Sequence, residues 1–309
     1  PKMQSTPDIL MIRPVKFGFN EQTADSNAFQ RHEVREEPLQ DRALAEFDHF
    51  VRVLRDAGVR VTVIEDTPQP HTPDSIFPNN WLTTHADGVI YLYPMEAENR
   101  RLERRVDIVE IIRKDYLVED VKDLSSFEKE GKYLEGTGSM VLDRDNKIVY
   151  ACLSSRTNEE VLSSFAAASG FRIVPFHAFD ELGKAIYHTN VMMALGSSCA
   201  IVCLESIHDL KERSLLTDTL TATSKEIVAI SKRQMASFAG NMLELRNADG
   251  EKLLVLSSQA YHSLSGDQLR VLGRHFRLIH SPLDTIETAG GGSARCMIAE
   301  IYLPHRTAL

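Results

Sequence analysis

The sequence has 309 residues and a mass of 34.7 kDa, with 43% hydrophobic and 26% charged residues, which is typical of a soluble folded protein. Thirty-five basic and 44 acidic residues give a net charge of −9, so no basic footprint indicates a nucleic-acid partner. No apolar run reaches the roughly 18 residues of a membrane span, and the first residues resemble no signal peptide. We therefore expect a cytoplasmic protein with no membrane partner.

The predicted elements follow one pattern along the chain. The amino-terminal part supplies a strand-like run, ILMIRPV, a helix over about 42–57 and a second run, VRVTVIE. Short polar segments then precede apolar runs that end in turns rich in Gly, Asn and Asp, as tight hairpins require. The turns are HADG (85–88), DRDN (143–146), GSSC (196–199) and NADG (247–250).

Each hairpin is followed by helical spacing and then by another strand-like run. The helical stretches lie near 97–114, 158–168, 210–224 and 260–275, and the third strands are YLVEDV, FRIVPF, EIVAI and FRLIH. The chain ends in one more strand, MIAEIYL, which lacks a helix and a third strand. Joined to the amino-terminal strand, helix and strand, it completes a fifth unit.

The spacing of the polar segments indicates an internal repeat. If Asn80, Gly138, Asn190, Asn241 and Cys296 are equivalent, the intervals between them are 58, 52, 51 and 55 residues. Such units predict a five-bladed α/β propeller of ββαβ units around a pseudo-fivefold axis. Both chain termini share one blade, no sheet edge is left open, and residues 1–309 form a single catalytic domain. The alternative is a doubly wound α/β sheet, but no Gly-rich phosphate loop supports it.

The predicted ring brings chemically useful residues to one axis. The polar segments offer Asn79 and Asn80, Glu135, His188 and Asn190, Asn241 and Cys296. A cysteine attacks as a thiolate, a histidine can protonate a leaving amine, and a carboxylate can orient that histidine. We therefore expect Cys296, His188 and Glu135 to act together as a catalytic set.

Structural roles are the alternative for each of these residues. Cys152, Cys199 and Cys203 lie in apolar runs without paired metal-ligand spacing, and we expect them to be buried packing residues. His188 could be a satisfied residue at a strand end, and Glu135 a solvated charge. We expect Trp81 to pack in the core, and the run RRLERR at 100–105 to form a solvated helix face.

At these residues the sequence resembles the guanidino-group-modifying (pentein) superfamily of arginine deiminases, dimethylarginine hydrolases and amidinotransferases. The family's Phe-x-x-Asp, Glu-Gly-Gly-Asp and His-x-Asp segments match Phe77–Asn80, Glu135–Gly138 and His188–Asn190, and its carboxyl-terminal nucleophile matches Cys296. The segment Leu153–Thr157 resembles a family segment whose arginine, here Arg156, holds a substrate carboxylate. The resemblance spans nearly the whole chain.

The resemblance implies a mechanism without a cofactor or a metal. Cys296 would attack the central carbon of a guanidino or ureido group, and His188 would protonate the departing nitrogen. Water activated by His188 would then hydrolyse the thio-intermediate, while Glu135 would bind substrate nitrogens and orient the histidine.

Three departures from the family pattern indicate the substrate. Asn80, Gly138 and Asn190 occupy positions where the family places carboxylates. A buried guanidinium without counter-charges is costly, whereas a neutral ureido group needs partners that donate and accept hydrogen bonds. The sequence also resembles citrulline-utilisation hydrolases around PDSIFPNNW. We therefore expect hydrolysis of citrulline to ornithine, ammonia and carbon dioxide.

The expected substrate-binding residues follow from this hypothesis. Asn79, Asn80 and Asn190 would receive the ureido group, with Asn241 a further amide at the axis, and Arg156 or Arg13 would bind the carboxylate. Asp74 would either touch the ligand or shape its turn.

Two other functions stay open from the sequence. One is a guanidine hydrolase, of the arginine deiminase or dimethylarginine hydrolase kind, with Glu135 alone as counter-charge. The other is a non-catalytic binding protein, because fold does not fix function. The oligomeric state is also open, a homo-oligomer included.

Overall fold

The computed structural model describes residues 3–32 and 38–307. Its strands are β1 (Asp8–Arg13), β2 (Arg60–Glu65), β3 (Leu82–Thr84), β4 (Val89–Leu92), β5 (Asp120–Asp123), β6 (Val141–Asp143), β7 (Ile148–Cys152), β8 (Arg172–Phe176), β9 (Met193–Leu195), β10 (Cys199–Val202), β11 (Glu226–Ala229), β12 (Leu243–Arg246), β13 (Lys252–Ser257), β14 (Arg277–Ser281) and β15 (Ala299–Glu300). Its α-helices are α1 (Leu39–Asp56), α2 (Glu98–Arg101), α3 (Val106–Asp115), α4 (Gly136–Ser139), α5 (Glu159–Ser169), α6 (Leu210–Ala222), α7 (Lys232–Ala236), α8 (Ser258–Ser263) and α9 (Gly266–His275).

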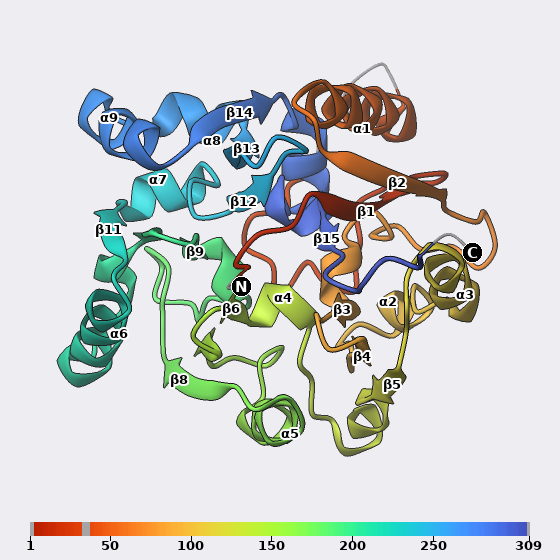
Figure 1. The fold of residues 1–309 in the computed structure, drawn as a ribbon, viewed down its shortest axis with the longest axis horizontal. Coiled ribbons are helices and arrows are strands. Elements are labelled where there is room, and N and C mark those ends of the chain that lie inside the picture. Colours follow the sequence, from red (N-terminus) through yellow and green to blue (C-terminus); the bar gives the residue numbers. More distant parts are fainter. Residues whose placement is uncertain (1–2, 33–37, 308–309) are drawn as a thin grey trace.

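Across the described residues the strands form five separate three-stranded sheets with one common plan. In each sheet the middle strand pairs antiparallel with one neighbour and parallel with the other, as β4 does with β3 and β5. The parallel partner follows after a helical connection, so each unit reads ββαβ. Figure 1 shows the sheets arranged around a common centre, with α1, α3, α5, α6 and α9 around the outside.

The two ends of the chain share one sheet, as the sequence predicts. Strand β15 pairs antiparallel with β1, with Ile9 opposite Glu300, and β1 pairs parallel with β2. The last strand therefore completes a unit that the first residues begin. This pairing joins the amino-terminal and carboxyl-terminal segments around the centre (Figure 1).

The prediction that no sheet edge is left open is wrong, because no sheet formed by the described residues is closed on itself. Adjacent sheets do not continue into one another through a hydrogen-bonded ladder. Instead they meet through side chains and single hydrogen bonds, such as the one that the Thr84 hydroxyl of β3 donates to the carbonyl of Glu300 in β15, at 3.0 Å. Such contacts join neighbouring sheets at an edge strand without pairing them into one continuous sheet.

The hydrophobic core lies between the sheets and the outer helices. Helix α1 buries Phe47 and Phe50 against Ile9 and Met11 of β1 and against Leu253 of β13. Trp81 is buried in another apolar cluster, as predicted. The apolar face of α1 therefore packs against the strands and excludes water from this part of the core.

Two predicted helices are each divided. The stretch 97–114 contains α2 and α3, separated by residues 102–105. The stretch 260–275 contains parts of α8 and all of α9, because Ser265 starts a new helix and forms a capping box with Gln268. The hairpin turns and three of the third strands lie where the sequence predicts them, whereas β5 begins at Asp120, four residues after the start of the predicted strand YLVEDV.

The short segments that precede the first strands meet at the centre of the molecule. They include the helical turns Pro78–Asn80, Gly136–Ser139, Thr189–Val191 and Arg295–Met297, and adjacent turns are in contact. Gly240 precedes the first strand of a further sheet, and a Cβ atom there would lie 2.2 Å from the carbonyl oxygen of Val191. Only glycine permits this backbone approach.

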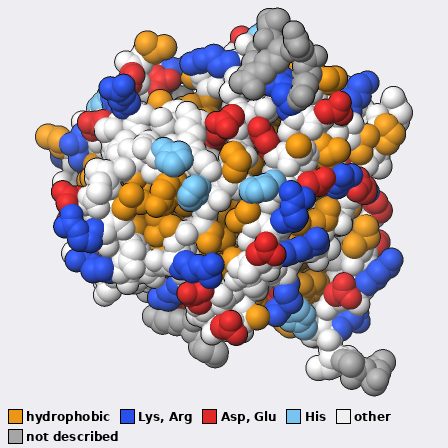
Figure 2. Space-filling view, turned by 90° about the horizontal axis from the view of Figure 1, so that it is seen from above, with side chains coloured by type: hydrophobic (Ala, Val, Ile, Leu, Met, Phe, Trp, Pro, Cys, Tyr) orange, Lys and Arg blue, Asp and Glu red, His pale blue; other side chains and the backbone are white. Residues whose placement is uncertain are grey.

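Among the described residues, no helix combines the length and apolar character that crossing a bilayer requires. On the face shown in Figure 2, Lys and Arg side chains are interspersed with Asp and Glu side chains. Neither sign of charge dominates that face.

Candidate active site

A small cavity lies where the central segments meet. Five of the predicted site residues line it: Asp74, Asn80, Arg156, His188 and Cys296. The remaining lining residues are Thr23, Asn27, Phe77, Arg100, Tyr187 and Gly290–Gly292. Stretches separated by more than two hundred residues therefore face one hollow, as the repeat predicts.

Glu135 lies behind His188 and holds it. The His188 Nε2 atom is 2.7 Å from Glu135 Oε1, and both side chains are almost fully buried. Glu135 is held in turn by its backbone N–H, which donates to the Ser139 hydroxyl at 2.9 Å, and by the Glu96 backbone N–H, which donates to Oε2 at 2.9 Å. Glu135 is thus a buried partner of the imidazole and not a solvated charge.

Opposite electrostatic effects act on this pair. Burial would raise the pKa of Glu135, but the positive charge of Arg156 and the hydrogen bond from His188 outweigh it and hold this pKa well below its ordinary value. Burial lowers the pKa of His188, and Glu135 opposes that effect only in part. The resting site therefore holds a carboxylate beside a neutral imidazole, which can accept a proton from a thiol.

The sulfur of Cys296 faces amide groups. The Nδ2 atoms of Asn190 and Asn241 lie 3.4 Å and 3.3 Å from Cys296 Sγ. Neither asparagine lines the cavity, so the structure places both behind the cysteine. The sequence predicts both amides as substrate-binding residues, and in the structure both contact the Cys296 sulfur.

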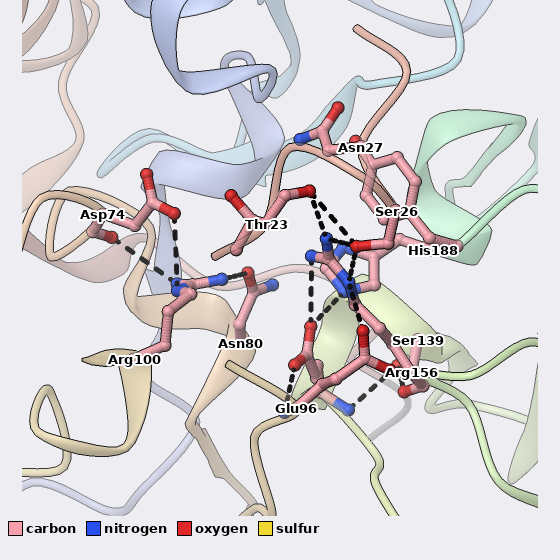
Figure 3. A network of polar contacts seen from close by, with 12 residues as sticks. Thr23, Ser26, Asn27, Asp74, Asn80, Glu96, Arg100, Ser139, Arg156 and His188 are labelled. Atoms are coloured by element: carbon pink, nitrogen blue, oxygen red, sulfur yellow. Dashed lines mark hydrogen bonds and ion pairs between the residues drawn. The ribbon is translucent and has the colours of Figure 1, made fainter. Parts of the chain in front are cut away.

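Asn79 and Asn80 form a chain of amides that ends at a buried arginine. Arg100 donates to Asn80 Oδ1 at 2.6 Å (Figure 3). Asn80 Nδ2 in turn donates to Asn79 Oδ1 at 2.9 Å. Asn79 Nδ2 is buried without a partner among the described residues. Asn80 lines the cavity directly and Asn79 lies behind it.

Arg100 is a site residue that the sequence reasoning missed. Its run was predicted to be a solvated helix face, but Arg100 and Glu103 are 2% and 3% exposed. The guanidinium forms two hydrogen bonds with Glu103, at 2.9 Å and 3.0 Å. The prediction assumed one continuous helix, whereas α2 ends at Arg101 and directs this pair inward. The break is marked by no Gly or Pro that the sequence could have revealed.

Arg156 enters the cavity as predicted. Its Nε atom donates to the Ser26 hydroxyl at 3.0 Å, and Nη2 donates to the Thr23 carbonyl at 3.3 Å (Figure 3). The carboxylates of Glu135 and Glu96 lie 3.6 Å and 4.0 Å from the guanidinium. The guanidinium also lies over the Tyr187 ring, 4.7 Å from its centroid. Neutral acceptors of the segment around 23–26 therefore supply most of its hydrogen bonds.

Asp74 lines the cavity and is not only a turn residue. Its Oδ2 atom accepts a hydrogen bond from Asn20 at 3.0 Å, and Arg100 Nε lies 3.9 Å away. Its Oδ1 atom is buried without a hydrogen-bond partner among the described residues. Burial raises the pKa of this carboxyl, with Arg100 opposing. A cationic group in the cavity would therefore find an acceptor here.

Arg13 is not part of this site, which corrects the sequence-based expectation. Its guanidinium is held by Asp48, with hydrogen bonds of 3.0 Å from Nε and Nη2, and by Glu65 at 3.2 Å. Two carboxylates thus already satisfy it, and it does not line the cavity.

The other cysteines are buried, as predicted. Cys152, Cys199 and Cys203 are fully buried in apolar surroundings, and burial raises their pKa values to about 12, 12 and 11. Within residues 3–32 and 38–307, no group of three or more His, Cys, Asp or Glu side chains is placed to hold a metal ion.

Solved structures with a similar fold include enzymes of guanidino compounds. ArgZ, an arginine dihydrolase from the ornithine-ammonia cycle in cyanobacteria, superposes with a TM-score of 0.76 at 16% identity over 97% of this chain. The match covers 42% of the ArgZ chain, so this chain spans less than half of that protein. The separate N-terminal domain of ArgZ matches over 98% of its length, with a TM-score of 0.75 at 16% identity and 96% of this chain covered.

A dimethylarginine dimethylaminohydrolase, solved as an adduct with S-methyl-L-thiocitrulline, has a TM-score of 0.66 at 16% identity, covering 97% of this chain and all of that one. At these identities the likeness shows a shared fold. A search of curated proteins finds no match.

The family model described as "N,N dimethylarginine dimethylhydrolase, eukaryotic" matches residues 13–303 and so includes every cavity-lining residue. This chain therefore belongs to that family, within the pentein superfamily of guanidino-group-modifying enzymes.

Proposed function

We propose that this protein is a cysteine-dependent hydrolase that acts on the ureido group of citrulline and releases ornithine, ammonia and carbon dioxide. The reacting end of the cavity carries the proposal. The amides of Asn190 and Asn241 contact the Cys296 sulfur, and Glu135, the carboxylate that contacts His188, also lies 3.6 Å from Arg156. Among the described residues, Asp74 is the one carboxylate that lines the cavity, and Glu135 behind it is already engaged, whereas a ureido group needs no counter-charge.

Gly138 strengthens this inference. A Cβ atom at this position would lie 2.6 Å from Asn80 Nδ2 and 2.8 Å from His188 Nδ1. A carboxylate side chain would therefore displace one of the two. The arrangement of Asn80 and His188 thus depends on the absence of the acid that the family commonly places here.

Two of the cavity-lining side chains suit the zwitterionic part of an amino acid. Arg156 is held mainly by the neutral Ser26 hydroxyl and Thr23 carbonyl, which a substrate carboxylate could replace with charge-assisted hydrogen bonds. Asp74 offers the unpartnered Oδ1 atom to an ammonium group. By contrast, Glu103 already satisfies much of the guanidinium of Arg100.

The proposed reaction balances without a cofactor. The Cys296 thiolate attacks the ureido carbon, and His188, after taking the thiol proton, donates it to the departing nitrogen as the carbon–nitrogen bond breaks. Water, deprotonated by His188, then attacks the same carbon and the carbon–sulfur bond breaks. The released carbamate decomposes to carbon dioxide and an amine, so citrulline and one water yield ornithine, ammonia and carbon dioxide.

Incubation of the purified protein with citrulline, arginine and dimethylarginine tests the proposal. We expect ammonia and ornithine from citrulline in equal amounts, and slower turnover of the two guanidino compounds. The Cys296→Ala variant is the control and is expected to be inactive. Faster turnover of arginine than of citrulline would overturn the choice of substrate.

A guanidine hydrolase is the second candidate, and the family match together with the fold shared with ArgZ favours it. Asn80→Asp separates the two. If Glu135 alone balances a guanidinium, a second carboxylate should raise arginine turnover. If the substrate is a ureide, the change should lower citrulline turnover without a gain for arginine, because the Nδ2 donor is lost.

We further propose that the five sheets are the blades of one pseudo-fivefold propeller and that residues 1–309 act as a single catalytic domain. The common strand plan and the shared sheet of β1 and β15 support this description.

A further inference from the structure

The Cys296 sulfur is the target of two carboxamides from different units. Asn190 belongs to the turn that begins beside His188, and Asn241 directly precedes β12. Their Nδ2 atoms lie 3.4 Å and 3.3 Å from Sγ, within the longer limit that suits sulfur as an acceptor. Asn190 and Asn241 are 1% and 2% exposed, so water competes poorly for these contacts.

Asn241 can only donate to the sulfur. Its Oδ1 atom accepts the backbone N–H groups of Arg295 and Cys296, at 3.0 Å and 3.4 Å. Its Nδ2 atom also donates to the Asn190 carbonyl at 2.9 Å. If the Asn241 amide were rotated by 180°, its oxygen would face the Asn190 carbonyl oxygen and its NH₂ group would face two N–H donors. Both contacts would be repulsive, so the contacts of Oδ1 and of Nδ2 both fix the orientation of the amide. Asn241 therefore positions the cysteine and presents an N–H group to it.

Asn190 supplies the second donor. Its Oδ1 atom has no partner among the described residues, and the residue lines a separate cavity of about 430 Å³ that also contains Glu244. The His-x-Asp segment of the family that the sequence resembles has an aspartate at this position. An aspartate here would put a second negative charge near a thiolate, whereas the amide puts a partial positive charge there.

Charged groups around Cys296 belong to several elements. The cavity that Cys296 lines is also lined by five other charged or titratable residues: Asp74, Arg100, Arg156, Tyr187 and His188. Glu135 lies behind His188, and Arg295, next in the chain, is paired with Glu300. Arg100, Arg156 and Arg295 are paired with the carboxylates of Asp74, Glu103, Glu135 and Glu300. Among the described residues, the side-chain donors to the Cys296 sulfur are amides and not arginines.

We propose that Asn190 and Asn241 form an amide cradle that stabilises the Cys296 thiolate by two N–H···S hydrogen bonds, with Asn241 also positioning the nucleophile. The proposal rests on the proposed function insofar as it takes Cys296 as the nucleophile. It assigns these two residues to the cysteine and not to the substrate. It also gives Asn190 a reason to be an amide that is independent of substrate charge.

The first test needs no variant and no substrate. Alkylation of the folded protein by iodoacetamide is measured from pH 5 to 10, with each cysteine followed separately by peptide mass spectrometry, and repeated in denaturant. We expect the pH midpoint for Cys296 to lie below its midpoint in the unfolded chain. Cys152, Cys199 and Cys203 are internal controls and should remain unlabelled while the protein is folded, because they are fully buried. A Cys296 midpoint at or above that of the unfolded chain would overturn the proposal.

The second test replaces a donor with a carboxylate. Asn241→Asp keeps an oxygen for the Arg295 and Cys296 N–H groups but removes the donor and adds a negative charge. Asn190→Asp does the same from the other side. We expect each to move the alkylation midpoint up by about one pH unit or more, and so to slow labelling about tenfold below the midpoint. Asn158→Asp, an N-cap position where Asp serves equally well, adds the same charge and should leave the midpoint unchanged.

A merely structural role would give a different result. In that case Asn241→Asp would lower the melting temperature without moving the alkylation midpoint, and this outcome contradicts the cradle. Should Asn241→Asp fail to fold, Asn190→Asp and the unmodified protein still decide the question. Because alkylation uses no substrate, its result is independent of whether citrulline is turned over.

Discussion

His188 and Glu135 form a buried pair in which the imidazole Nε2 and the carboxylate Oε1 are 2.7 Å apart, while Arg156 lies 3.6 Å from the same oxygen. The carboxylate supports the protonated imidazole that the reaction requires, against the effect of burial. Three segments of the chain thus determine the protonation state of one ring.

This pair predicts the effect of Glu135→Gln. Without the negative charge, burial disfavours the imidazolium more strongly, so we expect kcat to fall by roughly 10²- to 10³-fold with a smaller change in KM. Steady-state kinetics with citrulline measures both. The control is Glu212→Gln, which removes a carboxylate that contacts His177 at the surface. An equal loss of activity in both variants would contradict the role of Glu135.

The contacts of Arg156 predict a binding defect. Arg156→Gln should raise KM for citrulline by roughly 10- to 100-fold, because a charge-assisted pair with the substrate carboxylate is lost. A ureido amine of the same chain length without the carboxylate should lose much less. Arg13→Gln is the control, because Asp48 and Glu65 already hold Arg13, and its KM should not change. If the carboxylate-free compound suffers equally, Arg156 does not bind the carboxylate.

Glu287 predicts an alkaline loss of stability. It is 1% exposed, accepts a hydrogen bond from the Ser293 hydroxyl at 2.7 Å, and burial raises its pKa to about 8. The pKa of Glu287 in the folded protein lies above its unfolded value, so the protonated carboxyl stabilises the folded state. This contribution to the free energy of unfolding is fully present below about pH 4.5 and is lost as the pH rises through about 8.

The difference between Glu287→Gln and the unmodified protein measures this contribution. Relative to the variant, we expect the unmodified protein to lose roughly 4 kcal/mol of unfolding free energy between pH 5 and 9. Urea denaturation at each pH gives the values. Glu181→Gln, at an exposed position, should follow the unmodified protein. Parallel curves for Glu287→Gln and the unmodified protein would show that Glu287 is not the titrating group.

The close packing of central segments predicts the outcome of Gly240→Ala. Its Cβ atom would lie 2.2 Å from the Val191 carbonyl oxygen, so backbone must move and we expect a loss of about 3 kcal/mol or more. Gly273→Ala is the matched control. Position 273 lies within α9 with nothing within 4 Å of the added atom, so this change should stabilise the helix by up to about 1 kcal/mol. Thermal unfolding of both variants tests whether the loss of stability comes from the steric contact at position 240 and not from replacing a glycine as such.

The sequence by itself determined the repeating plan of the fold. Turn residues such as those at 85–88 and 247–250 encode hairpins locally, and apolar periodicity encodes the helices between them. The interval between equivalent polar segments then placed Asn80, His188 and Cys296 at one centre. These signals act within a few residues or repeat along the chain, so they can be read without coordinates.

Only the tertiary structure decided which side chains meet. The sequence offers Arg13 and Arg156 as equal candidates for binding a carboxylate. In the structure Arg13 is paired with Asp48, whereas Arg156 lines the cavity. Asn190 and Asn241 turned toward the sulfur, and Arg100 turned inward at the end of α2. Hydrogen-bond and ion-pair partners depend on distances between distant segments, and those distances are set by the packing of all five sheets together.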